Sequence, residues 1–154
     1  MQKIKFDTLD FGDIKEKAII FIHGWRGNKD SFKSLASIIK INNCRWYFPE
    51  APYDYNDNPK QKTWTYQHSD GKWEVEEPKS YLKDFIDNAV LKDFNAKDVY
   101  ILGFSQGATV CYEFILSLKY HFGGIFPIAG FIRDKDKAID IHSSQFNTPI
   151  IIGH

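Results

Sequence analysis

A serine that lies between two glycines is the residue of this 154-residue chain best placed to do chemistry. It is Ser105, in residues 103–107, which read GFSQG and have the form G-x-S-x-G. By composition alone, about one chain in twenty of this length contains that pattern, so its surroundings must decide its meaning. A β-branched, strand-like run at residues 99–102 leads into it, and an amphipathic helical pattern follows it. This context is typical of a nucleophile elbow, a sharp strand-to-helix turn that exposes a reactive serine.

The two glycines of the pattern have a steric reason. In such an elbow the serine takes a strained backbone conformation and presents its hydroxyl at the C-terminal edge of the sheet. Gly103 and Gly107 avoid Cβ clashes where the strand and the helix pack closely. The N-terminus of the helix favours negative charge that develops beside the serine. The alternative is a plain glycine-rich turn without chemistry, in which residue 105 has relaxed geometry or a buried hydroxyl.

A second motif, His23-Gly24-Trp25, follows the apolar run at residues 18–22. In such a fold the loop after this strand lies beside the elbow. We therefore expect the backbone N–H groups of Trp25 and Gln106 to form an oxyanion hole, in which one donor contributes about 3 kcal/mol to lowering the barrier. The alternative is that this motif only ends a strand. His23 itself is expected to be structural.

The elements that must position these groups alternate between apolar runs and helical patterns, which predicts an α/β fold with a mostly parallel sheet and helices on both faces. We expect a single domain over residues 1–154, with an aromatic-rich hairpin excursion at about 53–78 that turns at Asp70-Gly71. Asp30 is expected to cap the first helix. Strands are predicted at residues 18–22, 44–48, 98–102, 124–128 and 148–152, and helices at 30–39, 80–94 and 106–119.

Composition excludes several function classes. The 20 basic and 20 acidic residues balance, so the basic face of a nucleic-acid-binding protein is not expected. No run is apolar for long enough to span a bilayer, and no signal peptide is recognisable. The two cysteines, Cys44 and Cys111, make no disulfide framework, which favours a cytoplasmic location, and Cys111 is expected to be a packing residue. Neither a metal motif nor a cofactor motif is present, and the mixed-charge run 133–137 is expected to be a solvated loop.

Taken in order, the motifs resemble those of the phospholipase/carboxylesterase family of α/β-hydrolases, which includes bacterial carboxylesterases and acyl-protein thioesterases. The segments that carry the resemblance are residues 21–24, 48–52, 102–108, 128–131 and 148–154. The resemblance implies cleavage of a small-molecule carboxylic ester or thioester through an acyl-Ser105 intermediate. It also implies that the amides of Trp25 and Gln106 bind the oxyanion, and that Trp64 and Tyr66 line an acyl pocket. From the residues alone, stabilisation of the hairpin is an equal alternative for these two aromatic side chains. No cofactor is implied.

The chain departs from the family pattern after residue 154. In this fold the triad runs Ser, Asp, His along the chain, and in the family both partners of the serine follow the segment 148–154. We therefore expect the last strand and helix of the sheet, and the triad Asp and His, to be missing, and activity to be weak or absent. Within the chain, the residues that could replace the missing triad groups are Asp134 and Asp136 as the acid, and His121, His142 and His154 as the base.

A non-catalytic role is the alternative function. The chain would then be a fragment or a pseudo-hydrolase that acts as an acyl-group-binding or protein-binding module. A C-terminal strand at 148–152 would leave an unpaired sheet edge, which predicts self-association.

Overall fold

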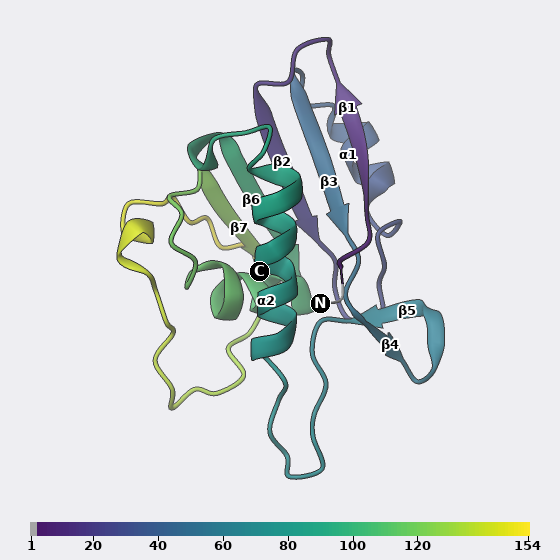
Figure 1. Ribbon diagram of the computed structural model, residues 1–154, viewed down its shortest axis with the longest axis vertical. Helices are drawn as coiled ribbons and strands as arrows, with labels where there is room; N and C mark the ends of the chain where they lie inside the picture. Colours follow the sequence, from purple (N-terminus) through teal and green to yellow (C-terminus); the bar gives the residue numbers. More distant parts are fainter. Residues whose placement is uncertain (1–2) are drawn as a thin grey trace.

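A five-stranded sheet forms the centre of the structure, a computed structural model that describes residues 3–154 (Figure 1). The strands are β1 (Phe6–Phe11), β2 (Lys17–Ile22), β3 (Cys44–Pro49), β6 (Val99–Phe104) and β7 (Gly124–Ile128). In the order β1-β3-β2-β6-β7, β1 is antiparallel to β3 and all other neighbours are parallel. The mostly parallel sheet is therefore confirmed. The edge strand β1 was not predicted, because its alternating exposure gives no continuous apolar run.

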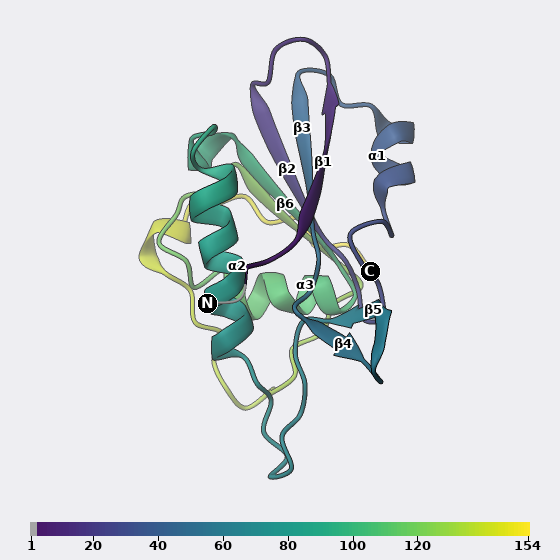
Figure 2. The same cartoon turned by 45° about the vertical axis from the view of Figure 1, so that its right-hand side comes forward.

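Helices cover both faces of this sheet, with α1 on one face and α2 and α3 on the other (Figures 1 and 2). Within residues 3–154, no helix combines the length and the apolar character that a bilayer crossing requires. The helical segments are α1 (Lys33–Ile39), α2 (Glu76–Phe85) with a π-helical turn at Ile86–Val90, α3 (Gln106–Val110) with a π-helical turn at Cys111–Ile115, and 3₁₀ turns at Ala96–Asp98 and Ser143–Gln145.

Strand β2 is buried on both faces, as its unbroken apolar run predicts. Ile19 and Phe21 pack on the side of α1, whereas Ala18, Ile20 and Ile22 pack on the side of α2 and α3. A central strand of this kind holds its C-terminal end in a fixed place, and the loop that follows it therefore starts from a rigid base.

Each sheet face contains one buried free cysteine. Cys44 lies in the cluster beneath α1, and Cys111 lies in the larger cluster on the other face. Burial raises the pKa of Cys44 to about 11 and raises the pKa of Cys111 further. Both thiols are therefore protonated at neutral pH and act as small packing groups.

Two expectations for α1 are wrong. Asp30 does not cap the helix, which has no side-chain cap; its carboxylate accepts a hydrogen bond from Lys33 Nζ at 2.5 Å instead. The predicted apolar face is only partly buried, because a helix of this length covers little of the sheet. Ala36 is fully buried, whereas Ile38 and Ile39 are exposed.

Residues 148–152 lie beside β7, but they do not form the predicted strand. Two isolated parallel bridges, Ile125 with Ile150 and Ile128 with Gly153, join this part of the chain to β7. Four backbone hydrogen bonds of 2.9–3.1 Å join the two segments, but Pro127 in β7 has no N–H to donate to Ile151 O, so the ladder is interrupted there. The segment therefore extends the sheet beyond β7 without forming a continuous ladder.

The excursion after β3 contains two turns. Strands β4 (Tyr53–Tyr55) and β5 (Asn58–Thr63) form a separate hairpin, whose Asn56 and Asp57 both have positive φ, as a two-residue hairpin turn requires. The predicted turn at Asp70-Gly71 is present, with a hydrogen bond from Gly71 N to His68 O at 2.9 Å. The strands predicted to flank that turn reduce to a single bridge. Of the two turns, the one between β4 and β5 therefore forms the regular hairpin.

Two glycines let strand β6, helix α3 and strand β2 pack with their backbones in direct contact. A Cβ on Gly107 would lie 2.1 Å from Ile22 O, and one on Gly103 would lie 2.3 Å from Gly107 O. Real Cβ atoms do not come this close to backbone, so any side chain here would push β2, β6 and α3 apart. The steric reason given for both glycines holds.

Residue His23 fixes the chain where β2 ends. Its Nδ1 donates to Gly24 O at 2.8 Å, and its Nε2 accepts from Ala51 N at 3.0 Å, so the ring is a neutral imidazole with one defined tautomer. Burial lowers the pKa of His23 to about 4. The ring therefore ties the loop after β2 to the loop after β3, which is a structural role.

Replacing Gly107 with alanine is expected to lower the free energy of unfolding by at least about 2 kcal/mol, because the added methyl group overpacks backbone that cannot yield. Gly153→Ala is the matched control: a Cβ there would come no nearer than 3.5 Å to another atom. Its effect is expected to stay within about 0.5 kcal/mol in urea denaturation. Equal midpoints for the two variants would contradict the close-approach argument.

Acidification is expected to destabilise the protein through His23. The folded protein keeps this ring neutral down to about pH 4, whereas the unfolded chain protonates it near pH 6.5. The unfolded state therefore binds more protons between these values, and stability falls as pH drops from 6.5 towards 4, by up to about 3 kcal/mol. An NMR titration of the His23 ring is expected to give a midpoint near 4; a midpoint near 6.5 would overturn the assignment.

Candidate active site

Residue Ser105 lies at the junction of β6 and α3 with φ 53° and ψ −115°, a region that costs energy for any residue with a Cβ. Its N–H donates to Ile128 O at 2.9 Å, and its carbonyl accepts from Ala108 N and Thr109 N in the first turn of α3. The residue is half-buried. This is the strained, accessible geometry that an elbow predicts and that a plain turn does not require.

The loop after β2 lies against this junction. A Cβ on Gly24 would lie 3.3 Å from the Ser105 Cβ. Paired backbone hydrogen bonds, from Arg26 N to Lys62 O and from Lys62 N to Gly27 O, each 2.9 Å, join the loop to β5. The β4–β5 hairpin therefore holds the loop from the outside while β2 holds it from the inside.

Two amides at the junction are available to a ligand. Among the described residues, neither the N–H of Trp25 nor the N–H of Gln106, the first residue of α3, has a hydrogen-bond acceptor. Both residues directly adjoin the Gly24–Ser105 contact, one in the loop and one in the helix. The arrangement can donate two hydrogen bonds to an oxygen that becomes negative during reaction.

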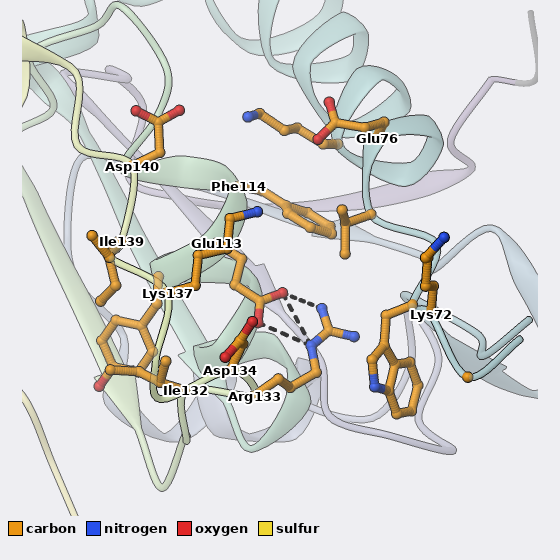
Figure 3. A pocket seen from close by; sticks show the side chains of 16 residues that line it. Lys72, Glu76, Glu113, Phe114, Ile132, Arg133, Asp134, Lys137, Ile139 and Asp140 are labelled. Atoms are coloured by element: carbon orange, nitrogen blue, oxygen red, sulfur yellow. Dashed lines mark hydrogen bonds and ion pairs between the residues drawn. The ribbon is translucent and has the colours of Figure 1, made fainter.

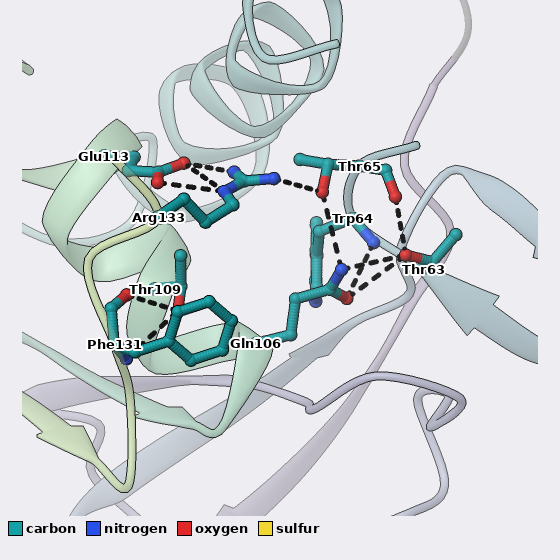
Figure 4. Close-up of polar contacts among 8 residues, drawn as sticks. All are labelled: Thr63, Trp64, Thr65, Gln106, Thr109, Glu113, Phe131 and Arg133. Carbon is teal, nitrogen blue, oxygen red and sulfur yellow. Dashed lines mark hydrogen bonds and ion pairs between the residues drawn. The ribbon is translucent and has the colours of Figure 1, made fainter. Parts of the chain in front are cut away.

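Hydrogen bonds hold the side chain of Gln106 against residues 63 and 64. Its Oε1 accepts from Trp64 N at 3.1 Å, and its Nε2 donates to Thr63 Oγ1 at 2.9 Å (Figure 4). A backbone N–H can only donate, so these contacts fix which end of the amide is oxygen. Gln106 thus connects the elbow with the segment that follows β5.

The expectation that Trp64 lines an acyl pocket is wrong, because its ring is fully buried. Its Nε1 donates to His23 O at 2.9 Å, and the ring packs 5.2 Å from the His23 ring. Trp64 therefore supports the loop after β2 from below. Tyr66 is partly exposed and packs edge-on against Tyr53 at 4.8 Å, and its role as pocket lining stays a prediction.

A small cavity of about 230 Å³ adjoins the elbow. The Trp25 ring, half exposed, packs edge-on against Tyr55, and the Arg26 guanidinium lies over both rings. The cavity is lined by Gly24, Trp25, Arg26, Gly27, Ser31, Phe32 and Phe104. Phe104 directly precedes Ser105, so this cavity lies beside the elbow.

A larger cavity of about 590 Å³ lies between the second turn of the excursion, the π-helical turn after α3 and the loop 132–140 (Figure 3). Its lining combines aromatic and aliphatic side chains with charged ones, and it includes neither Ser105 nor Trp25. Arg133 and Glu113 form an ion pair in its wall.

The charged run 133–137 is thus not entirely the solvated loop that was expected. The Arg133 side chain is only 10% exposed. Its partner Glu113 is 20 residues away in sequence, so the alternating charges gave no signal of the contact.

No proposed acid or base reaches the serine. Within residues 3–154, no His or Asp side chain forms a hydrogen bond with the Ser105 hydroxyl, and no group of three or more metal-ligating side chains is present. All five substitutes weighed from the sequence are exposed, namely Asp134, Asp136, His121, His142 and His154.

Known proteins share both the sequence pattern and the fold. Acyl-protein thioesterase 1 of Debaryomyces hansenii is 30% identical over 166 residues, and that of Kluyveromyces lactis is 27% identical over 155; each match covers 90% of this chain and 68% of the relative. Among solved structures, the esterase PE8 superposes with a TM-score of 0.79 at 18% identity, covering 98% of this chain and 74% of that chain.

A phospholipase/carboxylesterase of Dyadobacter fermentans superposes with a TM-score of 0.74 at 20% identity, covering 99% of this chain and 73% of that one. The sheet order and the covering helices are thus those of α/β-hydrolases. The model of the phospholipase/carboxylesterase family matches residues 10–154, which include the elbow and both amides. By this match, the chain belongs to the phospholipase/carboxylesterase family of α/β-hydrolases.

Proposed function

We propose that the chain cleaves carboxylic esters or thioesters through an acyl intermediate on Ser105. The observation that supports this most directly is the strained backbone of Ser105 beside two amides that lack acceptors among the described residues. Strain of this kind persists only where the surrounding packing enforces it, and here the two elbow glycines do so. The thioesterases and esterases to which the chain is similar support the substrate class.

The chemistry follows from the order of groups around Ser105. Its oxygen attacks the carbonyl carbon, its proton passes to a base, and the former carbonyl oxygen becomes an oxyanion that the amides of Trp25 and Gln106 stabilise. Collapse of this intermediate expels the alcohol or thiol, which takes up the proton, and leaves an acyl ester on Ser105. Water then repeats the attack and releases the carboxylic acid.

The residues described here supply the nucleophile and the oxyanion donors, and they place no base against the hydroxyl. A neutral serine hydroxyl is a weak nucleophile, and loss of triad groups costs on the order of 10⁴–10⁶ in turnover. Oxyanion stabilisation and substrate binding alone retain about 10³ over water. We therefore propose slow acylation for these residues by themselves.

The test is covalent labelling of Ser105 with a fluorophosphonate, together with hydrolysis of p-nitrophenyl butyrate. Labelling is expected at Ser105, as located by mass spectrometry, and Ser105→Ala is expected to abolish it. Ser37→Ala, which removes an exposed hydroxyl on α1, is the matched control and is expected to leave labelling unchanged.

Turnover that survives Ser105→Ala would remove Ser105 from the mechanism. Complete absence of labelling in the unaltered chain would leave the alternative, a module that binds acyl groups or a protein without cleaving a bond.

A further inference from the structure

The side chain of Arg133 lies inside the protein, although its neighbours in sequence are exposed. Its Nε donates to both carboxylate oxygens of Glu113, at 2.9 and 3.1 Å, and its Nη2 donates to the same carboxylate. The guanidinium also lies 5.0 Å from the centre of the Trp73 ring. These contacts leave the planar guanidinium in one orientation, with Nη1 pointing away from the carboxylate.

That remaining nitrogen, Nη1, donates to Thr65 Oγ1 at 2.6 Å (Figure 4). Thr65 is buried, and its hydroxyl is also 3.5 Å from Nε2 of Gln106. The neighbouring Thr63 donates its own hydroxyl to Thr65 O at 2.7 Å and accepts from Gln106 Nε2. A continuous polar chain therefore runs from Glu113 through Arg133 and the two threonines to Gln106.

Both ends of this chain are attached to the same stretch of helix. Gln106 is the first residue of α3, and Glu113 lies in the π-helical turn that continues it. Between them, Thr109 Oγ1 donates to Phe131 O at 2.8 Å and lies 3.3 Å from Phe131 N, which anchors the loop that carries Arg133. The polar chain thus closes a ring from α3, across two loops, back to α3.

We propose that Arg133 is a positioning residue: through Thr65 it fixes the Gln106 side chain, and so orients the Gln106 amide that the proposed mechanism uses as an oxyanion donor. This rests on the proposed function. Gln106 bears both the side chain that is held and the amide that donates, so anchoring the side chain to residues 63 and 64 also restrains the backbone at the start of α3. Since misplacement by about 1 Å can cost 10² in rate, even a loosened hold should be measurable.

The ordinary alternative is that the Arg133–Glu113 pair only stabilises its loop. Thr65 separates the two roles. Thr65→Val removes the hydroxyl that joins Arg133 to Gln106 and leaves the ion pair in place, whereas Thr65→Ser keeps the hydroxyl.

For Thr65→Val, kcat for p-nitrophenyl butyrate, or the fluorophosphonate labelling rate where turnover is slow, is expected to fall about 10-fold with KM within 2-fold. Thr65→Ser is expected to restore the rate to within about 2-fold of the original, and Arg133→Met to match Thr65→Val. Ile86→Val, a buried change in the turn after α2, controls for lost stability and should leave the rate unchanged.

Rates for Thr65→Val and Thr65→Ser that both equal the original would overturn the proposal, as would a loss in Thr65→Val that appears only in KM. NMR of the Gln106 side-chain NH₂ group gives a readout that does not need catalysis. Its two proton resonances are expected to move and to exchange faster in Thr65→Val and Arg133→Met, and not in Thr65→Ser. If the unaltered chain is never labelled, the proposed function fails, while unchanged Gln106 resonances in Thr65→Val would separately refute the positioning role.

Discussion

Contact between bare backbone atoms of β2, β6 and α3 is the constraint on which the rest of the structure depends. The three elements approach so closely at Gly103 and Gly107 that no side chain fits between them. The chain must therefore turn from strand to helix within one residue, and this turn forces Ser105 into its strained conformation. Packing energy spread over a large buried core maintains a local conformation that would otherwise relax.

The same constraint organises the groups around the serine. Because β2 ends at a buried strand terminus, the loop with Trp25 starts from a fixed point, and the neutral ring of His23 ties it to the loop after β3. Gln106 begins α3 immediately after the strained residue, so its amide lies at the N-terminal end of the helix. The excursion then encloses this arrangement from outside, through Trp64 below the loop and Thr63 beside Gln106.

Local features of the fold were predictable from sequence, whereas contacts between distant segments were not. The unbroken apolar run of β2 and the glycine spacing around Ser105 are patterns that neighbouring residues create, and the structure has both elements. Trp64 is indistinguishable in sequence from an exposed pocket aromatic, since its burial depends on the His23 carbonyl 41 residues away. Arg133 gave the same difficulty, because its guanidinium pairs with the Glu113 carboxylate and donates to the Thr65 hydroxyl, and neither residue is near it in sequence.

The placement of the two cysteines has a practical consequence. One thiol is sealed under α1 and the other beneath the elbow, on opposite faces of the sheet, and neither is accessible to reagent while the protein is folded. Alkylation of each thiol can therefore proceed only when its own layer opens. The alkylation rates of Cys44 and Cys111, measured separately by peptide mass spectrometry, report how often the packing on each face of the sheet opens. The chain carries these two reporters without any introduced label.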